Sequence, residues 1–436
     1  MDPSLIGIIL FGSLVLFLAL GIPVSFAMGG ISIILGFVFW GGLPSVDGFV
    51  LGSYSKITES ILTALPLYIF MAAILMYSDL ADDLYEAVYR WFGGIRGGLA
   101  AGTTVIASVF AAMVGIASVA TATLGMVARP SMLKRGYDDK LTLGIIMAGG
   151  TLGVLIPPSI VMIVYSAESG VSAGALFMAG IVPGILAAFL FILYAVVLCL
   201  IYPEKGPKTP KGERFTWQEK FASLKSVIIP LFVILIVLGS IYLGVATPTE
   251  AGAVGATGSL VAAAIRNKLT LQNIKKVFLM TVRLNGLIFW ILIGAVAYAR
   301  IVSVTGVGNS LASVILDANF NAWTVLILML VLFLVLGMVI DTVAVLLITA
   351  PLFLPALAAL DFDLLWFGVL FVIAVCIGNL SPPFGISLFV MRGVASDVGL
   401  KQIYVAVWPF IALLLFTMLL VLIFPQLALW LPEVMK

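Results

Sequence analysis

Gly153-Val154-Leu155-Ile156-Pro157-Pro158-Ser159 is the stretch that decides the fold, because Gly378-Asn379-Leu380-Ser381-Pro382-Pro383-Phe384 repeats its pattern 225 positions later (378 − 153). Each stretch lies in the middle of an apolar run of about 25 residues. A tandem proline removes two backbone donors and biases the preceding residue away from the α conformation. We therefore expect two helices, over about 141–167 and 365–395, that are broken in the middle of the membrane.

The same offset of 225 residues links other prolines of the chain. It separates Pro23 from Pro248 and Pro130 from Pro355. Prolines mark helix starts and breaks. Because three such landmarks share one spacing without gaps, the pattern indicates an internal repeat.

The longest polar stretch, residues 204–225, separates the two copies. It contains six basic residues and three glutamates. We interpret it as a linker between one repeat at 1–203 and a second at 226–436. By the positive-inside rule this linker is cytoplasmic.

Counting apolar runs outward from the linker assigns a side to the other loops. Basic loops fall on the cytoplasmic side in both halves, and the stretch 41–60, which we expect to be a loop, falls outside. The same unit therefore enters the membrane from opposite sides in the two halves. Inverted-topology repeats of this kind are typical of secondary transporters.

The composition is that of a polytopic membrane protein. Of the 436 residues, 63% are hydrophobic and 10% are charged, whereas about 25% of residues in a soluble domain are charged. Because one helical crossing takes about 20 apolar residues, the chain has room for roughly ten to twelve membrane segments. We predict an all-α fold made of two inverted repeats with re-entrant hairpins and broken helices.

Composition also excludes several functions. The chain contains no histidine, which removes histidine metal centres and Ser-His or Cys-His catalysis. Cys199 and Cys376 lie in apolar runs and are expected to be buried thiols. A net charge of +2 gives no indication of nucleic-acid binding. We therefore expect a protein that is not an enzyme and has no cofactor.

Two segments are too short for a pair of crossings. The 32 residues 97–128 carry no charge, whereas two full crossings need about 40 residues. We predict a re-entrant hairpin at about 97–130 with its tip at Gly115–Ser118, and its repeat mate at about 322–357 with a tip at Ile340–Thr342. Non-helical backbone at that depth is tolerated only where it packs in protein or faces a cavity, so the tips are candidate walls of a binding site.

Asp341 is the only ionisable residue between Asp317 and Asp361, and it lies at the tip of the second hairpin. A charge at the bilayer centre costs about 2.5 to 3.5 kcal/mol on insertion scales. Its role can be structural, as the N-cap of the following arm, or functional, as a ligand of a cation or of the transported molecule. Both roles are compatible.

Neutral oxygens complete the candidate site. Freed carbonyls at helix breaks and positive half-helix N-termini commonly bind sodium and anionic substrates. Hydroxyls can join them or bond the helix backbone instead, and Arg392 can bind a carboxylate or extend to the cytoplasmic surface. We predict that the substrate contacts Ser118, Thr121, Ser159, Asp341, Thr342 and Arg392, and that sodium contacts Gly115, Ser118, Gly153, Ile156, Asp341, Thr342, Gly378, Asn379 and Ser381.

Further motifs run through both halves in order. They include Ser118-Val119-Ala120-Thr121-Ala122, Gly150-Thr151-Leu152-Gly153, Thr247-Pro248-Thr249-Glu250-Ala251 and Gly337-Met338-Val339-Ile340-Asp341-Thr342. Together they resemble the large membrane (M) subunit of tripartite ATP-independent periplasmic (TRAP) transporters over nearly the whole chain. The first hairpin tip differs, because a hydroxyl-rich Ser-Gly-Ser-Ser-like turn of that family is Val114-Gly115-Ile116-Ala117-Ser118 here.

The resemblance implies a sodium-driven elevator in the inner membrane of a bacterium or archaeon, with a hairpin-bearing transport domain that slides against a scaffold. It also implies two partners, a small four-helix membrane (Q) subunit and a periplasmic substrate-binding (P) protein. The cargo would be a small organic anion such as a C4-dicarboxylate or sialic acid. A self-sufficient sodium- or proton-coupled anion carrier is the main alternative, and a channel is another, since re-entrant segments also build pores.

Overall fold

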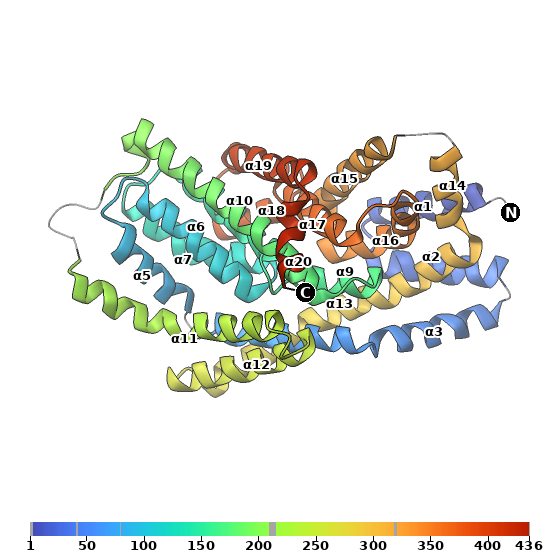
Figure 1. The fold of residues 1–436 in the computed structure, drawn as a ribbon, viewed down its shortest axis with the longest axis horizontal. Helices are drawn as coiled ribbons and strands as arrows, with labels where there is room; N and C mark the ends of the chain where they lie inside the picture. The colour runs from blue at the N-terminus through green and yellow to red at the C-terminus, as the bar shows by residue number, and fades with distance from the viewer. Residues whose placement is uncertain (1–2, 41, 79, 209–214, 318–320, 436) are drawn as a thin grey trace.

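The computed structural model describes residues 3–40, 42–78, 80–208, 215–317 and 321–435. These residues form twenty α-helices and two 3₁₀ helices, and they contain no β-strand. The predicted all-α membrane fold is therefore confirmed (Figure 1).

The apolar helices of the structure are of two lengths. Within the described residues, six helices are long and apolar enough, or seven if the bent pair Leu43–Ile57 and Ser60–Met76 is one span. Five shorter apolar helices of 10–17 residues account for much of the remaining apolar sequence. The expected ten to twelve membrane segments therefore include both full-length and shorter helices.

The first half of the chain ends with a long helix that leads into the linker. Its helices are α1 (Pro3–Ala19), α2 (Val24–Phe39), α3 (Leu43–Ile57), η1 (Ser60–Thr63), α4 (Ala64–Met76), α5 (Leu80–Phe92), α6 (Gly98–Val114), α7 (Ala117–Lys134), α8 (Asp139–Leu155), α9 (Ile160–Ser169), α10 (Ala173–Ile201) and η2 (Pro203–Lys205).

The second half follows the linker. Its helices are α11 (Trp217–Tyr242), α12 (Pro248–Ile265), α13 (Leu271–Thr305), α14 (Val307–Asp317), α15 (Ala322–Val339), α16 (Thr342–Ala359), α17 (Leu364–Leu380), α18 (Ile386–Val394), α19 (Leu400–Ile423) and α20 (Gln426–Val434).

Helices end at the predicted breaks and tips. Both Pro-Pro pairs separate two helices, α8 from α9 and α17 from α18. The first hairpin turns at Gly115–Ile116, between α6 and α7, and the second at Ile340–Asp341, between α15 and α16. The ends of α6 and α15, at Val114 and Val339, are 225 residues apart, like the prolines. The division into two repeats stays a prediction.

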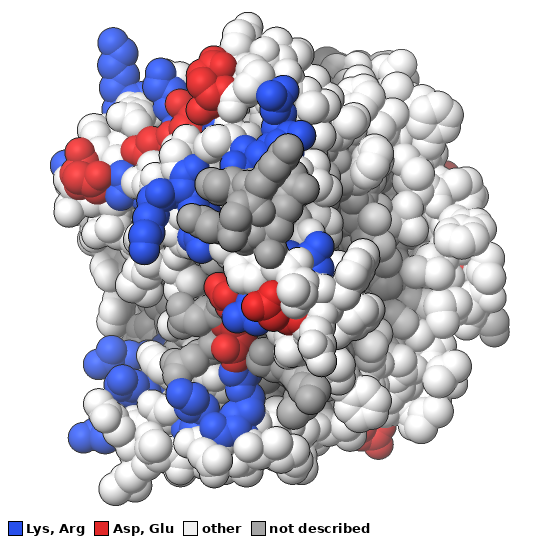
Figure 2. Space-filling view, turned by 90° about the vertical axis from the view of Figure 1, so that its left-hand side faces the viewer, with Lys and Arg blue, Asp and Glu red and all other residues white. Residues whose placement is uncertain are grey.

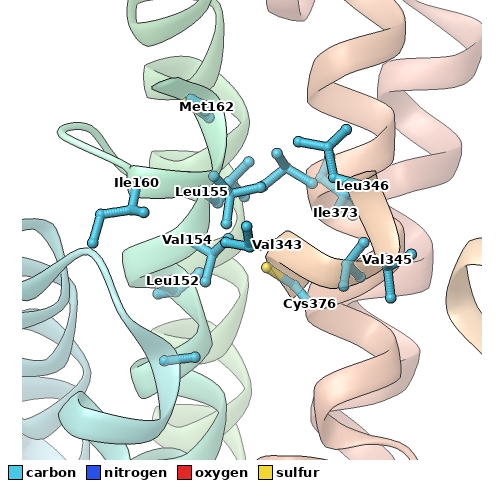
Figure 3. Close-up of a cluster of buried hydrophobic side chains, with 14 of the residues drawn as sticks. Leu152, Val154, Leu155, Ile160, Met162, Val343, Val345, Leu346, Ile373 and Cys376 are labelled. Carbon is cyan, nitrogen blue, oxygen red and sulfur yellow. The ribbon is translucent and has the colours of Figure 1, made fainter. Parts of the chain in front are cut away.

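The two broken helices cross at the centre of the molecule. The segment from Asp139 to Ser169 is 94% buried over its most apolar window. The Cys376 thiol of α17 lies 3.3 Å from the Thr151 carbonyl oxygen of α8, and these two residues are themselves 225 positions apart. Figure 3 shows Leu152 and Val154 of the first broken helix facing Val343 of α16 and Cys376 of α17.

The two hairpins pack differently. Both arms of the first hairpin, α6 and α7, pack against α8, whereas the second arm of the other hairpin, α16, packs mainly against α13 and α14. Helix α13 is 35 residues long and also contacts α2, α3 and α4. The second hairpin therefore lies, through α16, against the long helix that also contacts α2, α3 and α4.

Two predicted loops are partly helical. The stretch 41–60, expected as a loop, contains α3, whose apolar surface includes Val50 and Leu51 on the outside of the protein. The linker predicted at 204–225 ends early, because α11 begins at Trp217. A capping box formed by Thr216 and Glu219 explains this start, and its S/T-x-x-E pattern precedes an apolar run.

Candidate functional site

A cavity lies where both hairpin tips meet both helix breaks. It has about 70 Å³ of volume accessible to water. Five predicted site residues line it, namely Gly115, Ser118, Asp341, Thr342 and Asn379. The structure therefore brings together predicted residues from three segments that are far apart in the sequence, the two hairpin tips and the second helix break.

The first tip is seated on the first helix break. Gly115 has a φ of +65°, a conformation that glycine adopts without strain. A Cβ atom at this position would lie 3.1 Å from the carbonyl oxygen of Pro158. A tight turn and a close backbone approach therefore both require glycine here.

The second tip carries the charge of the cavity. The Asp341 side chain accepts a hydrogen bond from the Val343 backbone N–H at 3.0 Å, which confirms it as the N-cap of α16. The residue is nonetheless solvent-exposed and lines the cavity. Thr342 follows it and accepts a hydrogen bond from the Asn379 side-chain amide at 3.1 Å. The second tip and the second helix break are thus joined by side chains.

Four helix N-termini converge on the cavity. The first residues of α7, α9, α16 and α18 all line it. Each helix N-terminus carries the equivalent of about +0.5 charge. Since Asp341 is the one ionisable residue among the lining residues, the field of these four ends favours an anion, and the carboxylate favours a cation beside it.

The remaining wall comes from α13. Leu284, Leu287 and Ile288 of this helix line the cavity opposite the tips. These residues were not predicted, because nothing in the sequence distinguishes an apolar residue that faces a site from the others on a long apolar helix. The site is therefore built between the hairpin-bearing helices and α13.

Seven predicted residues lie outside the cavity lining. The hydroxyls of Ser159 and Ser381 donate to backbone carbonyls of Val154 and Ile377 at 2.6 and 2.7 Å. The Arg392 guanidinium donates to carbonyls just after its own helix, including that of Val398 at 2.6 Å.

The others lie in tight helix contacts. The Thr121 hydroxyl is buried beside Gly150 of α8, without a hydrogen-bond partner among the described residues. Gly153 is buried within α8. Ile156 packs on Gly184 of α10, and Gly378 packs on Gly337 of α15.

Ser387 is a cavity residue that the sequence analysis missed. It lies in the first turn of α18, is 1% exposed, and its hydroxyl has no hydrogen-bond partner among the described residues. The oxygen of the Asn379 side chain, at 4% exposure, is likewise without a partner. A signal was present in the sequence, since Ser387 follows the second Pro-Pro pair by four residues.

An ion network ties the first hairpin to the second broken helix away from the cavity. The buried Arg129 of α7 donates to Asp139 at the start of α8 and, through two nitrogens at 2.7 and 2.8 Å, to Asp397 after α18. Gln402 of α19 donates to Asp139. Figure 2 shows charged side chains gathered on the end of the molecule where α6 and α7 have their outer ends.

Comparison with known proteins identifies the family. Residues 11–427 match the family described as the tripartite ATP-independent periplasmic transporter, DctM component. The chain belongs to the DctM family. The resemblance noted in the sequence is thereby confirmed. Since DctM proteins are transporter permeases, the expectation that the chain is not an enzyme is confirmed as well.

Relatives of known description span the whole chain. The C4-dicarboxylate TRAP transporter large permease protein DctM of Rhodobacter capsulatus is 29% identical, over 98% of this chain and 99% of that protein. The ectoine TRAP transporter large permease protein TeaC of Halomonas elongata is 31% identical, over 95% and 96%. The isethionate TRAP transporter permease protein DctMQ of Oleidesulfovibrio alaskensis is 29% identical, over 94% of this chain and 64% of its own length.

The fold is also shared with a distant transporter. The YdaH transporter of Alcanivorax borkumensis has a TM-score of 0.62 to this DctM chain, with 13% identity and 99% coverage of both chains. At this identity the likeness concerns the fold alone.

Proposed function

We propose that the chain imports a small organic anion together with sodium, as the large membrane subunit of a TRAP transporter in a bacterial or archaeal inner membrane. The observation that carries this proposal is the convergence of four helix N-termini and the Asp341 carboxylate on one cavity. The N-termini attract the anion, and Asp341 with nearby carbonyls and hydroxyls offers oxygen ligands to sodium.

Two partners complete the proposed transporter. A small membrane subunit would bind alongside this chain, and a periplasmic binding protein would deliver the anion from the outer side. Support for the membrane partner comes from the isethionate relative, named DctMQ, of whose length this chain matches only 64%. The basic linker would remain cytoplasmic.

The proposed movement is a sliding of the hairpin-bearing helices along α13. The α13 side of the cavity is apolar, so few directional bonds would have to break when the hairpin helices move past it. This favours translation of a packed body over local rearrangement, because apolar contacts are non-directional. Alternating access through such a movement is typical of inverted-repeat transporters.

Uptake by the reconstituted transporter tests the proposal. The chain, its small membrane subunit and its binding protein are placed in proteoliposomes, and anion uptake is measured with an inward sodium gradient or with potassium instead. We expect uptake only with sodium and binding protein. Sodium-independent uptake by this chain alone would overturn the proposal in favour of a self-sufficient carrier or a channel.

A matched pair of variants links uptake to the cavity. Asp341→Asn is expected to lower the initial rate at least about tenfold, because the amide loses the charge that attracts sodium. Asp363→Asn is the control, since Asp363 is also an N-cap aspartate, of α17, but lies outside the cavity lining. Equal rates in both variants would remove Asp341 from the site.

A further inference from the structure

We propose that the transported anion is a small amphipathic monocarboxylate. Its carboxylate end would lie in the half of the cavity formed by α16, α17 and α18, and its apolar end would face the first hairpin tip and α13. This inference rests on the proposed function and narrows its substrate class.

One half of the cavity holds nearly all of its side-chain oxygens. Asp341 and Thr342 come from the second hairpin tip, and Asn379 and Ser387 come from the two sides of the second helix break. The free oxygen of Asn379 and the hydroxyl of Ser387 are buried without partners among the described residues. Buried polar atoms are normally hydrogen-bonded, so this half has unused capacity for a polar ligand and its cation.

The other half is apolar at the equivalent positions. The residues found 225 positions before Asp341, Thr342, Asn379 and Ser387 are Ile116, Ala117, Val154 and Met162. The first three of these line the same cavity. Three of the four oxygen-bearing residues are therefore matched by a hydrocarbon side chain that lines the same cavity, and Ser118 is the hydroxyl residue among the lining residues of the apolar half.

This asymmetry discriminates between classes of anion. A dicarboxylate has a charged group at each end, and a sugar acid carries hydroxyls along its length. In either case, polar groups would face the side chains of Ile116, Ile160 and Leu287, which cannot replace the hydrogen bonds lost to water. The donors on this side are the backbone N–H groups at the N-termini of α7 and α9, and hydroxyls or a second carboxylate would find few side-chain partners there. A monocarboxylate places a hydrocarbon there. A sodium ion between Asp341 and the carboxylate would join the two negative groups.

A series of anions with equal carbon number tests the inference. Butanoate, succinate and 2,3,4-trihydroxybutanoate are titrated into the purified membrane complex without the binding protein, in sodium and in potassium buffers, and binding is followed by calorimetry. In sodium we expect butanoate to bind about tenfold more tightly than either of the others. In potassium we expect all three to bind weakly.

Variants separate the two halves of the cavity. Ser387→Ala removes a hydroxyl from the polar half and is expected to weaken butanoate binding about tenfold. Ile116→Thr keeps a branched Cβ but adds a hydroxyl to the apolar half, so the preference for butanoate over succinate should fall about tenfold. Ser259→Ala is the control, because that buried hydroxyl donates to a carbonyl of its own helix, α12.

The outcomes distinguish a failure of the monocarboxylate assignment from a failure of the proposed function. If succinate or the trihydroxy acid binds in sodium at least as tightly as butanoate, the monocarboxylate assignment is wrong and sodium-coupled anion transport stands. If no anion binds more tightly in sodium than in potassium, both fail. If Ser387→Ala binds butanoate as the control does, the placement of the carboxylate in the polar half is overturned, even where Ile116→Thr does not fold.

Discussion

Asn379 joins the second helix break to the second hairpin tip through one hydrogen bond. Its amide nitrogen donates to the Thr342 hydroxyl at 3.1 Å, and its oxygen faces the cavity unpaired among the described residues. This bond fixes which atom of the amide is left for a ligand. The orientation of Asn379 therefore depends on Thr342.

Thr342→Val tests this dependence. Valine has a similar shape but removes the acceptor, so the Asn379 amide loses its partner, at a cost of about 1 to 3 kcal/mol. We expect a higher sodium concentration for half-maximal uptake, since the amide is free to turn. Thr349→Val on the same helix is the control, because the Thr349 hydroxyl bonds only to carbonyls of α16 in the described structure. The same sodium dependence in both variants would contradict the prediction.

At the residue scale, a sequence pattern indicates how deep in the membrane a residue lies, but it does not indicate which way the side chain points. Asp341 was identified because a lone charge in an apolar run is costly. Ser159 and Ser381 were equally plausible in the sequence, yet their hydroxyls bond to their own backbone. Ser387 was missed because its position four residues after the second Pro-Pro pair does not show by itself that the side chain faces the cavity.

At the scale of elements, the helices α15 and α17 are held together by a glycine contact. Gly378 was predicted to bind sodium, but it packs against Gly337, and a Cβ atom at Gly378 would lie 2.6 Å from the Leu334 carbonyl oxygen. Close approach of helix backbones in membranes commonly needs such small residues. Gly378 thus permits this approach, and its contact with sodium stays a prediction.

Gly378→Ala should therefore separate α15 from α17. Overpacking of this kind typically costs about 1 to 3 kcal/mol, and we expect the free energy of unfolding in detergent to fall by that amount. Gly30→Ala, in α2, is the control, since a Cβ atom there would have no neighbour within 4 Å. A loss of stability as large in the control would show that the contact with Gly337 is not the cause.

The ion network of Arg129 makes another element contact sensitive to pH. Hydrogen bonds from the Arg129 guanidinium lower the pKa of the Asp397 carboxyl below its usual value. A lowered pKa in the folded state stabilises the protein above the unfolded pKa, about 3.9, and this contribution is lost as pH falls through the folded value. The bridge should thus hold at neutral pH and open in acid.

Thermal unfolding between pH 7 and pH 3 checks this sign. Wild-type protein should lose more of its melting temperature over this range than Asp397→Asn, which has no carboxylate to protonate at that position. Asp47→Asn serves for comparison, because Asp47 is exposed and forms no ion pair among the described residues. If wild type and Asp397→Asn have parallel pH profiles, the bridge contributes nothing to stability.

For the whole molecule, orientation is the property that the charge pattern predicts and chemical labelling can test. Ser172 and Lys208 are both exposed, and they lie at opposite ends of the long helix α10, Ser172 just before it and Lys208 after it. In a background without Cys199 and Cys376, the variant Lys208→Cys should react with a membrane-impermeant maleimide only after the membrane is permeabilised. The variant Ser172→Cys should react in intact spheroplasts. The reverse pattern would show that the orientation is opposite to the one proposed.

The overall architecture was largely predictable because prolines and glycines act locally on the backbone, and because runs without charged residues mark the membrane segments. The turns at Gly115 and Ile340 and the breaks at both Pro-Pro pairs follow from such local rules. The wall from α13 and the different packing of α16 do not, since they depend on contacts between segments far apart in the chain.

The central crossing of α8 and α17 has a consequence for how the chain is made. Ribosomes add about 5 to 20 residues per second, so the 225 positions between Thr151 and Cys376 correspond to roughly 10 to 45 seconds of translation. During that interval α8 is already in the membrane while α17 does not yet exist. Helix α8, which is buried from Leu141 to Leu155 in the finished protein, must therefore wait among lipids or insertion factors, and its glycines and threonines suit it to close packing against a later partner.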